Sequence, residues 1–217
     1  MLLRFWELEA EKRKMKKSIK LFVMAVLLIA GGRVFAQDTH EYVDLGLPSG
    51  TLWATCNVGA TTPEGKGDHF TWGDTNPEIY DGVKRPIKYW DNQSGFIKYR
   101  REEGLFVLLP EDDAATVNWG PEWRTPTMED WKELKENTRV ENFTMNGVWG
   151  FRYIGPNGNS IFLPGAGWNQ YFDGRGNYWS STLLLNSNAE AYCFWYTGFS
   201  NVRRDNGCSV RPVRVTK

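Results

Sequence analysis

The segment that most constrains the fold lies near the end of the chain, at residues 190–213, and reads EAYCFWYTGFSNVRRDNGCSVRPV. Its first part is apolar or aromatic at consecutive positions, whereas a half-exposed strand alternates. The run breaks at Thr197 and Gly198 and returns through a charged tip. A strand that is apolar on both faces is either sandwiched between two layers or shows one face to a partner. The residues alone leave both alternatives open.

The length of 217 residues allows one domain or at most two. Hydrophobic residues make up 41% and aromatic residues 15% of the chain, which is enough for a packed core and too much for a disordered protein. The 22 glycines and 11 tryptophans favour short strands and turns over a helical bundle.

The first 36 residues have the pattern of a targeting segment. Basic residues at 16–20 precede an apolar run at 21–32 that is too short to span a membrane comfortably. Small residues end the run, so we expect a signal peptide that is cleaved before Gln37. The alternative is a membrane anchor that is retained. No cysteine stands at the cleavage site, which argues against a bacterial lipid anchor.

Residues 1–14 carry mixed charge, unlike the start of a signal peptide, so we expect translation to begin at Met15. Residues 37–217 then form a single exported domain, and its location is the periplasm, the cell surface or the medium. No stable membrane span is expected after cleavage.

Removal of this segment makes the chain acidic. Subtracting its eight basic and three acidic residues from the totals of 26 each leaves 18 basic and 23 acidic residues, a net charge of −5. An acidic surface argues against nucleic acid as a partner, because phosphate binding needs basic side chains. It also argues against polybasic docking to membranes.

The three cysteines are Cys56, Cys193 and Cys208. One candidate disulfide joins Cys193 to Cys208 and closes a hairpin-sized loop, with Cys56 as a small buried hydrophobe. The alternative is that none of them pairs.

The first half of the domain is rich in turns. Residues 41–60 predict two short strands around a Leu-Pro-Ser-Gly turn at 47–50. Residues 61–108 predict long loops with one short strand. Residues 110–120 predict a short helix, which either Asp112 or Asp113 could cap.

The strongest helix prediction covers residues 123–138. Thr127 is a good N-cap, and Asp130 stands three residues on, where a capping box usually has Glu or Gln. Thr125 before Pro126 is a second candidate start. Met128, Trp131 and Leu134 form an apolar stripe at helical spacing. We interpret this stripe as the side of the helix that faces the core.

After about residue 147 the chain predicts strands and turns. GVWGFRYIG, SIFLPGAG, NYWSST and the last segment alternate or run apolar between turn residues. This order of elements predicts an α+β fold: strands, loops, two helices and then a further set of strands.

Several of these stretches resemble, in the same order, the Fibrobacter succinogenes major paralogous domain family. They are YVDLGLPSGTLWATCNVGA, DDAATVNWGPEWRTPTMEDWKEL, SIFLPGAG, NYWSST and GCSVRPV. The resemblance spans nearly the whole mature chain and implies an exported protein of a kind common in gut Bacteroidetes. It also implies a C-type-lectin-like fold, related to formylglycine-generating enzymes and to the variable proteins of diversity-generating retroelements. In the last group, the end of the domain displays variable residues on a rigid scaffold and binds ligands with them.

For the aromatic strand, the resemblance implies that one row faces the core and the next row faces outward. The implied core row is Tyr192, Phe194 and Tyr196, and the implied outward row is Cys193, Trp195 and Thr197. With the neighbouring loops, the candidate ligand-binding residues are Asn186, Asn188, Glu190, Cys193, Trp195, Thr197, Arg203, Arg204 and Asn206. The alternatives are that Trp195 packs under a loop and that residues 203–206 form an ordinary solvated turn.

Enzymatic interpretations find little support in the residues. His40 and His69 are too few and too far apart for a histidine metal site or a catalytic triad. The carboxylates at 111–113 suit the helix dipole better than calcium. The calcium-dependent sugar motifs of C-type lectins are absent from the sequence. We therefore expect no enzyme, no metal and no cofactor.

Two functions of different classes remain. The first is an exported binding module that presents residues of its last strands and loops to a protein or a glycan. The second is a structural component of the cell surface without a dedicated ligand site.

Overall fold

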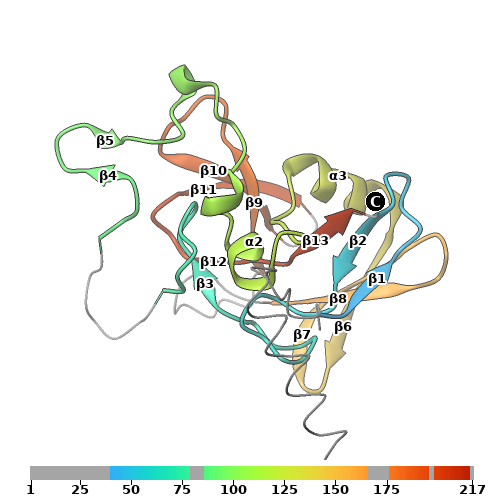
Figure 1. The fold of residues 1–217 in the computed structure, drawn as a ribbon. Coiled ribbons are helices and arrows are strands. Elements are labelled where there is room, and N and C mark those ends of the chain that lie inside the picture. Colours follow the sequence, from blue (N-terminus) through green and yellow to red (C-terminus); the bar gives the residue numbers. More distant parts are fainter. Residues whose placement is uncertain (1–39, 79–85, 166–175, 196–197, 216–217) are drawn as a thin grey trace, which may run out of the picture. The chain divides into compact units, whose positions relative to one another are not determined.

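In the residues that the structure describes, the chain folds as a mixed α+β protein in which sheets predominate and two α-helices lie in the middle of the sequence, as predicted (Figure 1). The computed structural model describes residues 40–78, 86–165, 176–195 and 198–215. In these ranges the helices are α2 (Ala114–Trp119) and α3 (Met128–Asn137), together with two 3-10 turns, η1 (Arg101–Glu103) and η2 (Pro110–Asp112).

The helix predicted at residues 110–120 is divided into η2 and α2, and Asp113 stands between them. The Asp113 carboxylate accepts hydrogen bonds from the backbone N–H of Ala115 at 2.9 Å and of Thr116 at 3.3 Å. Asp113 is therefore the N-cap of α2, which is one of the two caps that the sequence offered.

The start of α3 follows the predicted capping box, closed by an aspartate. Thr127 Oγ1 accepts a hydrogen bond from the backbone N–H of Asp130 at 3.2 Å, and the Asp130 carboxylate accepts one from the Thr127 N–H at 2.6 Å. Arg124 adds two hydrogen bonds to Asp130, of 2.6 and 2.9 Å. Burial alone would raise the pKa of Asp130, but the bonds and charge of Arg124 outweigh it and lower that pKa.

The strands of the described residues form three sheets of three or more strands and one two-stranded hairpin. The first contains β1 (Tyr42–Asp44), β2 (Thr51–Ala54) and β13 (Val213–Val215), so the strand pair expected in residues 41–60 is confirmed. The second has the order β11-β10-β9-β12-β3, formed by β3 (His69–Phe70), β9 (Asn177–Leu183), β10 (Glu190–Trp195), β11 (Gly198–Arg203) and β12 (Cys208–Ser209). The third contains β6 (Arg139–Met145), β7 (Val148–Ile154) and β8 (Ser160–Pro164). A separate hairpin joins β4 (Trp90–Asp91) to β5 (Gly95–Phe96).

Strand β6 was not expected, because its alternation is weak and it directly follows α3. It pairs with β7 in an antiparallel hairpin whose turn has positive φ at Asn146 (48°) and Gly147 (83°). An Asn-Gly pair with two positive φ angles is the usual sequence of a tight hairpin turn. This dipeptide was the local signal that could have located β6.

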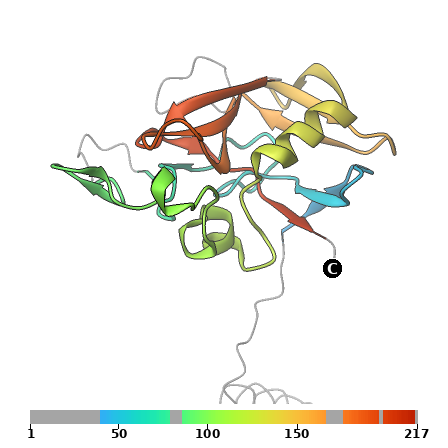
Figure 2. The same cartoon turned by 90° about the horizontal axis from the view of Figure 1, so that it is seen from above.

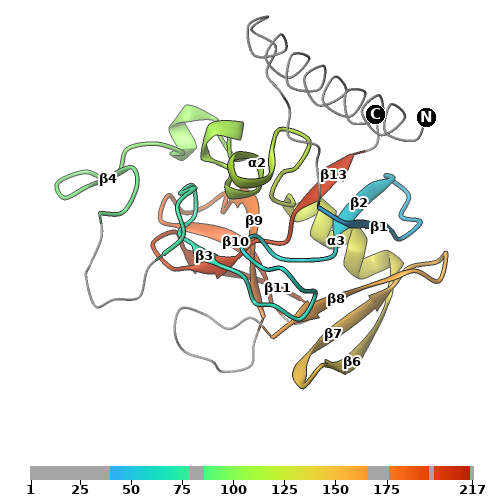
Figure 3. The same ribbon diagram turned by 60° about the horizontal axis from the view of Figure 1, so that its bottom comes forward.

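The second sheet has a separate core on each face, which answers the question raised by the aromatic segment. The α3-side core includes Trp53, Trp131, Leu134, Tyr153, Tyr178 and Phe194. The α2-side core includes Trp72, Ala115, Trp179, Leu183, Cys193 and Cys208. Figure 2 shows α3 and α2 on different sides of this sheet, and Figure 3 shows α3 beside the other two sheets. Strand β10 is therefore sandwiched between two layers.

A bilayer would need a longer and more apolar helix than any found in the described residues.

Candidate functional site

In the expected outward row of β10, Cys193 lies in the α2-side core. Cys193 is only 1% exposed, and Trp195, on the same face, is half-buried. The expectation that Cys193 faces outward is therefore wrong, because a packed layer covers this side chain. Thr197 lies outside the described residues.

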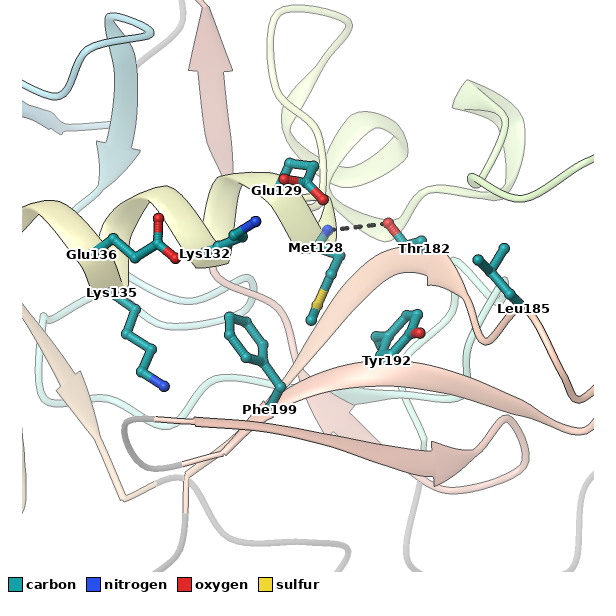
Figure 4. Close-up of a pocket in the computed structure, with 9 residues that line it drawn as sticks. All are labelled: Met128, Glu129, Lys132, Lys135, Glu136, Thr182, Leu185, Tyr192 and Phe199. Carbon is teal, nitrogen blue, oxygen red and sulfur yellow. Dashed lines mark hydrogen bonds between the residues drawn. The ribbon is translucent and has the colours of Figure 1, made fainter.

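The expected inward row of β10 is only partly covered. Phe194 is buried as expected, at 1% exposed. Tyr192 is half-exposed, although the resemblance implied a core position. The reason is that α3 crosses the sheet at Phe194 and leaves Tyr192 beside the helix (Figure 4). Tyr196 lies outside the described residues.

The three cysteines are free thiols. Strand β9 lies between β10 and β12, so two strand spacings, roughly 9–10 Å, separate Cys193 from Cys208. A disulfide needs Cα atoms within roughly 7 Å, so this geometry does not allow the candidate bond. Burial raises the pKa of Cys193 to about 12 and that of Cys208 well above its ordinary value. Neutral, buried thiols of this kind are poor nucleophiles.

The expected solvated tip contains one exposed and one buried arginine. Arg203 lies at the surface and forms an ion pair of 2.7 Å with Asp205. Arg204 is 0% exposed, with its guanidinium 3.9 Å from the ring centroid of Phe96 and 4.8 Å from that of Trp72. Its Nη1 donates to the backbone oxygens of Lys98, Tyr99 and Asn188. The expectation that Arg204 is displayed at the tip is therefore wrong, because this side chain is buried and anchors residues 98–99 to the sheet.

The other candidate residues lie in two places. Asn186 is exposed in the loop before β10, and Asn188 accepts a hydrogen bond from the Arg101 N–H at 2.9 Å. Glu190 forms a cross-strand pair with Arg203, so both side chains share the face of Tyr192. Asn206 is half-buried in the turn after β11. Of the nine candidates, Glu190 and Arg203 thus share a sheet face with a groove that the sequence did not reveal.

This groove lies between α3 and the β9–β10–β11 part of the sheet and has a volume of about 500 Å³ (Figure 4). Its apolar wall is formed by Met128, Leu185, Tyr192 and Phe199. The helix adds four charged residues, Glu129, Lys132, Lys135 and Glu136, and β9 adds Thr182. We call this site the α3–β11 groove.

Helix and strand periodicity explain why these side chains meet. Met128, Lys132 and Lys135 are spaced i, i+4 and i+7, so they share one face of α3 beside the buried stripe. In the sheet, Phe199 pairs with Phe194, and Asn201 pairs with Tyr192. Trp131 covers Phe194 in a stacked contact of 4.5 Å, while Phe199 remains half-exposed on the neighbouring strand.

The groove has polar groups that are available for a ligand. Lys135 Nζ lies 5.3 Å from the ring centroid of Phe199. Within the described residues, the four charged side chains of the rim form no ion pair with one another or with other groups. Thr182 Oγ1 accepts a hydrogen bond of 3.1 Å from the backbone N–H of Met128. Two cations and two anions therefore surround an apolar wall.

Sequence reasoning missed the residues that line this groove. Met128 was assigned to the core stripe, and the exposed helix face that carries Lys132 and Lys135 received no interpretation. Their i, i+4 and i+7 spacing was the available signal. That the face lies against Phe199 could not be found from spacing, because the two elements are far apart in the chain.

No cluster of three or more His, Cys, Asp or Glu side chains that could hold a metal ion is present in the described part of the chain. Comparison with protein-family models, with curated proteins and with solved structures finds no match. The site has to be interpreted from its own geometry.

Proposed function

We propose that this chain is an exported ligand-binding module with a C-type-lectin-like fold, and that it binds a protein ligand in the α3–β11 groove. The fold assignment is supported by the motifs at 41–60 and 123–138 together with the α+β order of elements. The observation that carries the function is the half-buried pair Tyr192 and Phe199 beside a helix whose four rim charges form no ion pair within the described residues.

The composition of the groove favours a protein over a glycan. A buried sugar hydroxyl needs a hydrogen-bond partner, and its burial is costly without one. Apart from its charged rim, the groove offers the hydroxyls of Thr182 and Tyr192 as polar groups, whereas Met128, Leu185 and Phe199 offer apolar surface. Aromatic residues dominate binding hot spots, and a flexible methionine adapts to the shape of a bound side chain. An apolar side chain of a protein, flanked by charged residues, fits these properties.

The test starts with an array of proteins and glycans that is probed with the purified chain. Tyr192→Ala combined with Phe199→Ala should weaken binding of the captured protein at least about tenfold. The double variant should lower the urea unfolding midpoint less than Phe194→Ala does, because both side chains are half-buried whereas Phe194 is buried. Trp149→Ala is the matched control, since it removes a 40% exposed aromatic side chain outside the groove.

The outcomes separate the alternatives. Binding that survives the double change and responds to Trp149→Ala would place the site elsewhere. Capture of glycans alone, lost in the double variant, would keep the binding module and overturn the choice of a protein. A chain that captures nothing would favour the structural role at the cell surface.

A further inference from the structure

Strand β11 is an edge strand, and its hydrogen-bonding pattern can be followed residue by residue. It pairs with β10 and ends the strand order of its sheet (Figure 1). The Arg204 N–H donates to the Ala189 carbonyl at 2.9 Å, so the even-numbered residues of β11 point their backbone groups toward β10. Backbone groups alternate in direction along a strand, so those of Phe199, Asn201 and Arg203 point away from the sheet.

Part of this outer edge has no partner. The Arg203 carbonyl accepts a hydrogen bond of 3.0 Å from the Asn206 N–H in the following turn. The outward N–H and C=O groups of Phe199 and Asn201 have no partner among the residues that the structure describes. An edge with free donors and acceptors is a template for an added strand.

The free edge and the α3–β11 groove belong to the same surface. The side chains of Phe199 and Asn201 lie on the face of Phe194 and Tyr192, which is the face that α3 partly covers. A strand added beside β11 would turn every second side chain toward this face, next to Phe199. Main-chain hydrogen bonds would then supply affinity, and the groove would select the side chains.

Charge indicates which side chains such a strand would carry. Lys135 Nζ lies over the Phe199 ring and has no carboxylate within ion-pair distance among the described residues. Lys132 lies one turn earlier on the same helix face. An acidic side chain next to an apolar one would complement this end of the groove.

We infer that the ligand is an extended peptide segment of a partner protein, added as a strand to the outer edge of β11, with apolar residues at alternate positions and an acidic residue near Lys135. This inference rests on the proposed function of the α3–β11 groove. It commits to a peptide strand and excludes a folded surface or a second copy of the chain as the occupant.

The probe is a random-peptide library displayed on phage, selected against the purified chain. Asn201→Pro removes the outward N–H without removing a hydrogen bond to β10, because proline is tolerated where the amide points away from the sheet. Asn201→Ala is the matched control, since it removes the same side chain and keeps the amide. We expect Asn201→Pro to weaken selected peptides at least about tenfold and Asn201→Ala to change their affinity less than about threefold.

A second measurement does not depend on the folding of a variant. N-methylation of alternate amides in a selected peptide should abolish binding in one register and leave it nearly unchanged in the other, because only every second amide faces β11. Circular dichroism and urea unfolding of Asn201→Pro check that the variant is folded.

The following results would overturn the addition of a peptide strand to β11. Peptides that are lost with Phe199→Ala but tolerate Asn201→Pro and N-methylation would overturn strand addition and keep the groove. Peptides that tolerate the Phe199→Ala and Tyr192→Ala changes as well would overturn both proposals. A library that yields no binder would overturn the inference. If the chain then forms dimers that Asn201→Pro dissociates, the occupant of the edge is a second copy.

Discussion

Trp131 of α3 and Phe194 of β10 are stacked face to face, with ring centroids 4.5 Å apart and 4° between the ring planes. Trp131 Nε1 also donates to the backbone oxygen of Trp179 at 3.2 Å, so the indole joins the helix to two strands. This contact holds α3 against the sheet and sets the position of the α3–β11 groove. The stability of the contact and the shape of the groove are therefore linked.

Replacement of Phe194 by alanine should lower the free energy of unfolding by about 3–5 kcal/mol, because it removes a buried ring and leaves a cavity under Trp131. Tyr192→Ala, two residues away on the same face, should cost about 1 kcal/mol or less, since this ring is half-exposed. Urea unfolding followed by tryptophan fluorescence measures both values. Equal losses in the two variants would mean that α3 does not cover Phe194 in solution.

Arg204→Ala should destabilise the protein by about 3 kcal/mol or more, because three backbone carbonyls lose a buried donor and two aromatic rings lose their partner. The neighbouring Arg203→Ala is the matched control and should cost less than about 0.5 kcal/mol, since it breaks only a surface ion pair. Limited proteolysis should show faster cleavage within residues 86–104 in Arg204→Ala alone. Similar behaviour of the two variants would contradict the anchoring role of Arg204.

Acid should unfold the protein partly through Asp112. Burial alone would raise the pKa of this carboxyl, but hydrogen bonds from Lys88, Lys98, Tyr99 and Tyr89 outweigh burial and hold the pKa well below its usual range. A lowered folded-state pKa means that the stabilisation is complete above the unfolded pKa of about 3.9 and is lost as the pH falls toward the folded value.

The check is the pH dependence of urea unfolding in wild type and in Asp112→Asn. The variant should be less stable at about pH 7, because Lys88 and Lys98 lose their buried counter-charge. It should also lose less stability than wild type between about pH 5 and pH 2. Parallel pH curves for the two proteins would show that Asp112 does not carry this dependence.

The three cysteines should be free thiols that differ in their accessibility to a thiol reagent. In the native protein, a maleimide reagent should modify Cys56, which is half-buried, much faster than Cys193 and Cys208, which are buried. In denaturant all three should react, and mass spectrometry counts the adducts. A disulfide between Cys193 and Cys208 would lower the mass of the intact protein by two hydrogens and leave a single thiol to react in denaturant. This result would contradict the strand order, which keeps the two residues too far apart for the bond.

Local signals located most of the secondary structure. Thr127 with Asp130, and Asp113 before α2, predict where the helices begin, because a cap depends on side chains within a few residues of the helix start. Arg211 is buried and donates to the Asn57 side chain at 2.7 Å within the core. Strand β6 was missed because its identity depends on pairing with β7 more than on its own alternation.

The candidate site was less accessible to sequence reasoning. Glu190 of β10 and Arg203 of β11 were named as candidates, but the expected outward orientation of Cys193 in β10 was wrong. Alternation predicts which residues share a face, and it predicts which face is buried only when the other face is polar. In β10 both rows are apolar, so the pattern contained no information on orientation.

The amino-acid sequence by itself determined the α+β class, the helix starts, the tight turns and the apolar character of both faces of the aromatic strand. These features depend on neighbouring residues. The burial of Cys193 and Arg204 and the meeting of Lys135 with Phe199 were decided by tertiary packing. These features depend on which layers cover each face of the second sheet. Elements far apart in the chain supply those layers, so no local pattern specifies them.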